Sequence, residues 1–192
     1  MERGSLVLRL ALTLLTVAAT PTHCSYHSHT LPNVHHEEKV TRLHFYLFDI
    51  ISGDKPSAVE VARSNSTKND SSATPFGSVW AIDDPLREGP EATSKVIGNA
   101  QGWGLYVSSV QDETKLGLVM YVDFGFTEGK FKGSSFSVFS RNPVTETNRE
   151  LAVVGGRGRF RMARGFAKLK TSYLNVTNGD AIIEYKVTLI HY

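Results

Sequence analysis

The chain consists largely of short runs of branched and aromatic residues, and each run is followed by a cluster of glycine, proline, asparagine, aspartate or serine. Such runs are typical of β-strands, because these side chains fit a pleated sheet and the clusters between them supply turns. No stretch of about ten to fifteen residues shows the 3.6-residue apolar period of a surface helix. The pattern predicts eight or nine strands, at Arg42–Ile51, Val59–Arg63, Ser78–Ile82, Lys95–Val107, Leu116–Phe126, Phe131–Ser140, Arg149–Val154, Phe160–Tyr173 and Ala181–Tyr192.

The missing helices also restrict how the strands are connected. A parallel sheet needs crossover helices, so an all-β antiparallel sandwich or closed barrel is expected. The sequence predicts two hairpin turns, one around Gly129 and one around Asn178–Gly179, because glycine can adopt the positive φ that a tight turn needs. Glycines inside strong strand patterns, such as Gly98 and Gly165, favour the barrel, because a sheet must bend sharply to close on itself. A closed antiparallel β-barrel of about eight strands can hold one small ligand.

The first 24 residues have the layout of a secretory signal peptide. Arg3 gives a positive start, Leu10–Ala19 is an apolar run, and Thr20–Ser25 is small and polar, as cleavage requires. An uncleaved membrane anchor is the alternative, but a bilayer span needs about 20 uninterrupted apolar residues. We therefore predict a signal peptide at 1–24, a flexible leader at 25–40 and one barrel domain at 41–192, secreted to the extracellular space and not held in a membrane.

Composition excludes several other classes of function. Lys plus Arg number 21 against 19 Asp plus Glu, and a net charge of +2 favours no nucleic-acid partner. Cleavage near Cys24 removes the single cysteine, which leaves neither a disulfide nor a thiol nucleophile. His35 and His36 lack a third ligand at metal spacing, so neither a metal nor any other cofactor is predicted. Three Asn-x-Ser/Thr sequons are candidate glycosylation sites, at Asn65, Asn69 and Asn175.

Asp49 is the carboxylate most suited to chemistry. It ends an apolar strand, and the two-residue period of a strand puts it on one face with Phe45 and Leu47, which could line a ligand pocket. Burial there would raise its pKa and make it a proton donor or base, unless an arginine lies nearby. The alternative is an aspartate that caps the turn toward Gly53. Asp123, in the middle of a later strand, is either a solvated outer residue or a second pocket acid.

Several separate stretches, in order along His44–Tyr192, resemble the dirigent family of plant secreted proteins. They are FYLFDIISGDKPSA, FGSVWAIDDPLREGPEATSKVIGNAQG, FTEGKFKGSSFSVFSRNP, RELAVVGGRGRFRMARGFA and GDAIIEYKVTLIHY. The resemblance implies an eight-stranded antiparallel β-barrel with a pocket at the barrel mouth, secreted to the apoplast and cell wall, glycosylated, and assembled as a homo-oligomer, either a dimer or a trimer.

The resemblance also implies a function without an oxidising centre. A separate laccase or peroxidase makes phenoxy radicals from a phenol such as coniferyl alcohol, and the dirigent protein orients them so that coupling gives one stereoisomer. In lignan-forming members two aspartates and an arginine are thought to act on quinone methide intermediates. Asp49 matches the first aspartate and Arg149 the arginine, whereas Asn142 stands where the second aspartate is expected. Tyr106 matches one of the paired aromatic residues of the pocket.

The departures from the lignan-forming pattern leave other functions open. An amide such as that of Asn142 can form hydrogen bonds but cannot donate a proton as an acid does. Phe48 and Gly104 also stand where lignan-forming members carry histidine and an aromatic residue. One alternative is a pterocarpan-synthase-like enzyme, a lyase that dehydrates an isoflavanol through a quinone methide. Another is a cell-wall protein that organises lignin deposition without a selective pocket.

Overall fold

The computed structural model describes residues 28–31, 37–65, 75–102, 107–108 and 117–192. The chain divides into two compact units, residues 1–35 and 36–192, and the second contains the barrel. The predicted signal peptide lies outside the described residues. Within the described part of the chain, no helix is long and apolar enough to cross a membrane.

The described residues form a fold of strands and very short 3₁₀ helices. The strands are β1 (Lys39–Asp49), β2 (Ala58–Ala62), β3 (Val79–Arg87), β4 (Val96–Gly102), β5 (Val107–Ser108), β6 (Leu118–Phe126), β7 (Ser135–Asn142), β8 (Arg149–Arg157), β9 (Arg164–Leu174) and β10 (Ala181–His191). The helices η2 (Gly129–Phe131) and η3 (Gly158–Phe160) form the β6–β7 and β8–β9 turns. The all-β prediction is therefore confirmed.

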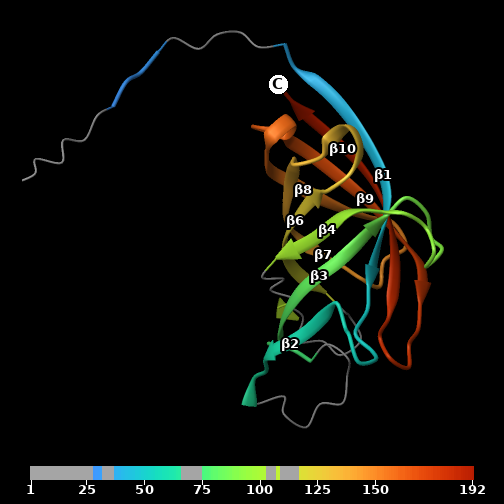
Figure 1. Cartoon of the computed structure of the whole chain (residues 1–192). Helices are drawn as coiled ribbons and strands as arrows, with labels where there is room; N and C mark the ends of the chain where they lie inside the picture. Colours follow the sequence, from blue (N-terminus) through green and yellow to red (C-terminus); the bar gives the residue numbers. More distant parts are fainter. Residues whose placement is uncertain (1–27, 32–36, 66–74, 103–106, 109–116) are drawn as a thin grey trace, which may run out of the picture. The chain divides into compact units, whose positions relative to one another are not determined.

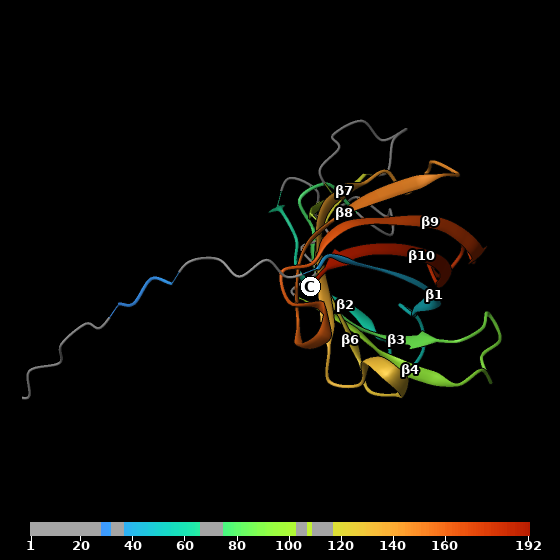
Figure 2. The same cartoon turned by 90° about the horizontal axis from the view of Figure 1, so that it is seen from above.

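The strands close into a ring. Every neighbouring pair is antiparallel, in the order β1–β10–β9–β8–β7–β6–β4–β3, and β3 pairs back onto β1. Figures 1 and 2 show this succession from the side and from above. β2 adds to the free half of β3, and β5 pairs with β6. The ring is the eight-stranded antiparallel barrel that the sequence predicts.

The closing seam depends on a strand that is longer than predicted. β3 was expected to end at Ile82, because Asp and Pro in the following DDPL read as a turn. In the structure β3 continues to Arg87, and Leu86 pairs with Leu47 of β1 across the seam. On its other side the same segment pairs with β4, with Pro85 opposite Asn99. Partners on both sides, which a local pattern does not reveal, override the turn propensity.

Two other strands start later than predicted. Phe131 and Phe160 belong to the 3₁₀ helices η2 and η3, so β7 begins at Ser135 and β9 at Arg164. Each helix starts at a glycine in the left-handed region, with φ of 66° at Gly129 and 65° at Gly158. The turn predicted around Gly129 is confirmed, as is the one around Asn178–Gly179, where Gly179 has φ of 84°.

Aromatic side chains fill the half of the barrel where β10 ends. Phe45 stacks on Tyr185 with ring centroids 5.4 Å apart, and Phe124 stacks on Phe136 at 4.8 Å. Phe160, which is fully buried, lies edge-on to Phe126 and Phe136. This half of the barrel is a packed aromatic core and not an open channel.

Glycine is required where strands approach closely around the ring. Gly165 has φ of 149°, and a Cβ atom there would clash with the carbonyl oxygen of Thr188 on β10. A Cβ at Gly98 would meet the carbonyl oxygen of Gly125 on β6. At both positions neighbouring strands approach too closely for any residue but glycine.

Candidate functional site

Three of the predicted site residues lie at the same end of the barrel. Asp49 is the last residue of β1, Asn142 the last of β7 and Arg149 the first of β8. β1 and β7 run in the same direction around the antiparallel ring and β8 in the opposite one, so all three strand ends meet at one rim. In Figure 1 this is the end nearest β2.

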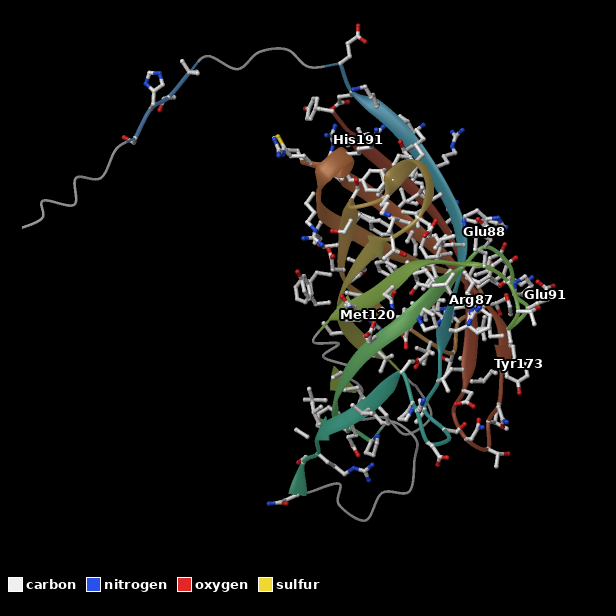
Figure 3. All side chains as sticks on the ribbon, in the orientation of Figure 1. Arg87, Glu88, Glu91, Met120, Tyr173 and His191 are labelled. Carbon is white, nitrogen blue, oxygen red and sulfur yellow. The ribbon has the colours of Figure 1, made fainter. Side chains whose placement is uncertain are left out.

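Arg149 carries a charge on the inner wall of this rim. It is only 4% exposed, because its side chain turns into the barrel between its neighbours. Its Nη1 donates to Oδ1 of Asn142 at 3.3 Å, and its Nη2 donates to Oγ1 of Thr171 at 2.7 Å. Asn142 in turn donates from Nδ2 to the sulfur of Met120 at 3.2 Å, a residue labelled in Figure 3. Contacts from β6, β7 and β9 thus fix the direction of the guanidinium.

A fully buried carboxyl, which the sequence analysis did not single out, lies on β3. The side chain of Asp84 has no solvent exposure. Its Oδ1 accepts a 2.6 Å hydrogen bond from Oγ of Ser57, and its Oδ2 makes no hydrogen bond to any part of the chain that the structure describes. The β1–β3 pairing ends where Leu47 lies against Leu86, and beyond it Ser57 bonds to Ile50, directly after β1, as well as to Asp84. Asp49 is close enough to Asp84 to act on it electrostatically.

The two carboxyls influence each other electrostatically. Burial raises the pKa of Asp84 well above its usual range, repulsion from Asp49 raises it further, and the hydrogen bond from Ser57 opposes both. Two neighbouring carboxylates resist double ionisation, so Asp84 keeps its proton to higher pH than an exposed aspartate. A carboxyl that is still protonated can act as a general acid toward a bound ligand.

Tyr185 lies where the charged rim meets the aromatic core. It is completely buried, and desolvation raises the pKa of its phenol. The positive charge of Arg149 opposes this effect, and the carboxyl groups of Asp84 and Asp49 reinforce it. All three charged groups therefore lie within electrostatic reach of one phenol. Tyr185 also stacks on Phe45, so it forms the boundary between core and site.

The residues predicted to line the pocket have different positions. Phe45 and Leu47 are 1% and 2% exposed, within the core beneath the charged groups, whereas Tyr106 lies outside the described residues. The hollows among the described residues include the following two. One of about 160 Å³ is bordered by β1 and η2, and the other lies on the outer surface at Asp83 and Gln101. Neither includes Asp49, so the pocket at the barrel mouth stays a prediction.

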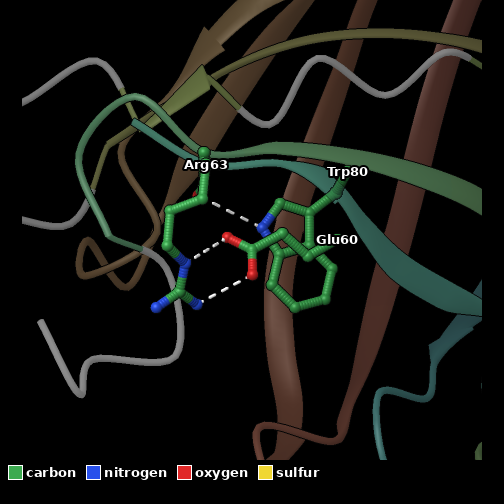
Figure 4. A network of polar contacts seen from close by, with 4 residues as sticks. Glu60, Arg63 and Trp80 are labelled. Atoms are coloured by element: carbon green, nitrogen blue, oxygen red, sulfur yellow. Dashed lines mark hydrogen bonds and ion pairs between the residues drawn. The ribbon is translucent and has the colours of Figure 1, made fainter. Parts of the chain in front are cut away.

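Trp80 is an aromatic wall residue that the sequence analysis did not identify. It shares the buried face of β3 with Ile82 and Asp84, and its Nε1 donates to Oγ of Ser78 at 3.2 Å. The strand rise puts it about 13 Å from Asp84, further toward the open rim. Figure 4 shows Trp80 beside a two-pronged contact in which the guanidinium of Arg63 donates to both carboxylate oxygens of Glu60, each at 2.8 Å.

The other predicted residues that the structure describes lie on the outer surface. Asp123 alternates with the buried Val122 and Phe124, and accepts a 2.9 Å hydrogen bond from Ser137, so the solvated alternative holds and Asp123 is not a pocket acid. Of the three sequons, Asn65 is exposed, Asn175 is half-buried with its Oδ1 accepting from the backbone of Thr177, and Asn69 lies outside the described residues.

Comparison with known proteins identifies the family. The model of the dirigent-like protein family matches residues 40–190. Dirigent protein 15 of Arabidopsis thaliana is 52% identical over 180 residues, which is 93% of this chain and 94% of the relative. Pterocarpan synthase 1 of Glycyrrhiza echinata is 44% identical over 186 residues, or 95% and 96% of the two chains. A solved structure of a pterocarpan synthase dirigent protein superposes with a TM-score of 0.74 at 44% identity, covering 88% of this chain and 99% of that one. On its sequence, its closed eight-stranded barrel and these relatives, the chain belongs to the dirigent family.

Proposed function

We propose that this protein directs the stereochemistry of phenylpropanoid coupling by holding phenoxy radicals and the quinone methides they form at the rim that carries Asp49, Asp84 and Arg149. A separate laccase or peroxidase makes the radicals. The observation that carries the proposal is one buried carboxyl, Asp84, and one buried guanidinium, Arg149, on an inner wall that is otherwise mostly apolar, with the half-buried Asp49 nearby. Such a wall accepts a planar aromatic ligand, and its few polar groups fix the orientation of that ligand.

The stereoselective step needs only orientation from the protein. Each radical contributes one electron to the new carbon–carbon bond, so coupling gives a bis-quinone methide and requires no redox group of the protein. A wall that presents one face of each radical replaces random encounters with a single positioned one. Trp80 and Ile82, on the same face of β3 as Asp84, supply apolar area toward the rim.

Ring closure of the quinone methide requires proton transfer. Its carbonyl oxygen takes a proton from the carboxyl pair, a hydroxyl group of the ligand adds to the exocyclic carbon, and that hydroxyl returns its proton to the carboxylate. Arg149 polarises the carbonyl oxygen of the quinone methide before that proton arrives. Because Asn142 cannot donate a proton as an acid does, we assign the second acid in this chain to Asp84. Its neighbour Asp49 helps to keep it protonated.

A dehydratase is the second candidate, supported by the same carboxyl pair and by relatives named pterocarpan synthase at 44% identity. In that reaction a carboxyl protonates the leaving hydroxyl group of an isoflavanol, and loss of water with deprotonation of the phenol gives a quinone methide. A second hydroxyl of the substrate then adds to the quinone methide. The net change is the loss of one water molecule, and no oxidase is needed.

Chiral chromatography of two parallel reactions tests both functions. One contains the protein, coniferyl alcohol and a laccase, and the other contains the protein and an isoflavanol without an oxidase. Enantiomeric excess in the first alone supports the directing role, and product in the second alone supports the dehydratase. Racemic coupling together with no dehydration refutes both for these substrates and favours a cell-wall organiser.

Matched variants tie either activity to the site. Asp49→Asn, Asp84→Asn and Arg149→Met should each reduce the enantiomeric excess or the turnover at least tenfold. Asp83→Asn is the control, because Asp83 is the exposed neighbour of Asp84 and bonds to Asn99 and Gln101 on the outer surface. Equal loss in the control and in the site variants would separate the activity from this rim.

A further inference from the structure

Two tight turns of the same design lie side by side at the end of the barrel opposite the candidate site. They are the β6–β7 turn, residues 127–134, and the β8–β9 turn, residues 155–162, which contains the GGRGRF run. The rings of Phe131 and Phe160, one from each turn, have centroids 4.7 Å apart. The backbone N–H of Arg159 donates to Oγ of Ser134 at 3.1 Å. Figure 1 shows the turns as the short yellow and orange coils near the end of β10.

This packing collects positive charge on one surface, which we call the basic end. Its members are exposed cations from the two turns, Lys130, Lys132, Arg157, Arg159 and Arg161. Among the described residues none of them forms an ion pair, and the one acid of the turns, Glu128, lies 3.6 Å from Lys95. The two turns together carry +4, whereas the whole chain carries +2, so the rest of the chain carries −2. The charge of this protein is therefore strongly segregated.

The fold does not need these charges for its own stability. The turns are held by the buried ring of Phe160, by left-handed glycines and by Ser134. Arg157 contributes only its Nε, which donates to Oγ of Ser135 at 2.8 Å. Like charges gathered on one surface repel each other and lower stability, unless a ligand of opposite charge neutralises them. The basic end thus has the charge distribution of a surface that binds an anion with several charges.

We propose that the basic end binds an anionic polysaccharide, a chain of uronic acid residues with one carboxylate on each sugar. Arginine binds carboxylates through two parallel hydrogen bonds, and cations spread over two turns can contact successive carboxylates of one polymer. The signal-peptide pattern predicts export, which favours a polymer found outside the cell over nucleic acid. η2 and η3 are single turns of three residues, so no long helix offers its N-terminus to a lone phosphate.

The position of the basic end leaves the candidate site free. β8 runs from Arg149 at the site to Arg157 at the basic end, eight residues later, which at strand rise is about 26 Å. A bound polymer would hold the barrel by one end while phenolic ligands reach the other. Polysaccharide binding does not depend on the proposed coupling chemistry, so a test of one can fail while a test of the other succeeds.

Binding to polygalacturonate tests the proposal with the full mature chain. The variant Lys130→Gln, Lys132→Gln, Arg159→Gln, Arg161→Gln removes four cations of the basic end. The control variant removes four exposed cations elsewhere, by Arg42→Gln, Lys55→Gln, Lys168→Gln and Lys170→Gln. We expect the first to weaken binding at least tenfold and the control less than threefold, with unchanged circular dichroism for both and no fall in melting temperature for either. Binding should also weaken steeply between 50 and 200 mM salt, because screening shortens the range of charge attraction.

Two results would overturn the proposal. One is equal binding by the wild-type protein, the basic-end variant and the control variant, since the attraction would then not come from this surface. The other is binding to duplex DNA or to vesicles containing phosphatidylserine that is as tight as binding to polygalacturonate and is lost in the same variant. That result would indicate a general preference for polyanions or phosphates instead of uronic acid polymers.

Discussion

Replacing Asp84 by asparagine should change how the stability of the protein depends on pH. The folded-state pKa of Asp84 lies well above the ordinary value of 3.8, because the group is buried and next to Asp49. Between the unfolded and folded pKa values the native state binds one proton more than the unfolded state. In that window the unfolding free energy therefore falls by about 1.4 kcal/mol per pH unit on account of this group alone. This loss of unfolding free energy is absent below the pKa of Asp84 in the unfolded state and constant above its pKa in the folded state.

Urea denaturation at half-unit steps from pH 4 to pH 8 measures this contribution. The quantity of interest is the difference between Asp84→Asn and wild type, because carboxylates that do not interact with Asp84 titrate equally in both. The difference should move in favour of the variant as pH rises through the window, by up to about 1.4 kcal/mol per unit. A constant offset is also expected, since the new amide keeps the bond from Ser57 but buries an N–H group without a partner. Asp83→Asn, on the outer face, should show no such trend. Parallel curves for Asp84→Asn and wild type would refute the buried, proton-retaining carboxyl.

Three further changes test the barrel that holds the site. Gly165→Ala should lower the free energy of unfolding in urea by about 1–3 kcal/mol, since its methyl group would meet the carbonyl of Thr188. The control Gly155→Ala, with open space around it, should change it by no more than about 0.5 kcal/mol. Equal effects would contradict the close approach of β9 and β10. Phe160→Ala should cost about 3–5 kcal/mol, because it empties the aromatic core, and a cost below about 1 kcal/mol would disprove that packing. Partial burial raises the pKa of Asp180, but hydrogen bonds from Ser52, Ile51 and Asn178 outweigh it, so the pKa is lowered. Asp180→Asn should therefore destabilise the protein at pH 7. Its stability should approach that of wild type as pH falls below the folded-state pKa of Asp180. Acid titration followed by circular dichroism would reveal a gap that stays constant if this reasoning is wrong.

Strand positions could be predicted because they depend on local side-chain chemistry. The two-residue alternation of β6, in which Leu118, Met120, Val122, Phe124 and Phe126 are all buried, is visible in the letters of the sequence. The same alternation does not predict whether Asp123 faces the interior, because a strand has two faces and only the neighbouring strands determine which one is buried. The register of β6 with β7 decided it by setting Val122 against Val138 in the core.

The site was predicted only in part, for a related reason. Asp49 could be identified by its strand position and by its match to the family pattern, and Arg149 by its match to the family pattern alone. Asp84 could not, because in the local sequence DDPL it is one of two adjacent aspartates before a proline, which is the composition of an exposed turn. β3 buries one of this pair and exposes the other, a distinction that arises only when β1 closes the ring against it.

The sequence by itself determined the strand chemistry, the tight glycine bends and the family, because each depends on residues close together in the chain. Only the tertiary structure decided which charges face one another. Asp49 acts electrostatically on Asp84 near the seam, and the cations of two turns gather at the far end through the packing of Phe131 on Phe160. Electrostatic effects depend on distance in space, and barrel closure sets those distances between residues that are 35 positions or, for the two rings, 29 positions apart along the chain.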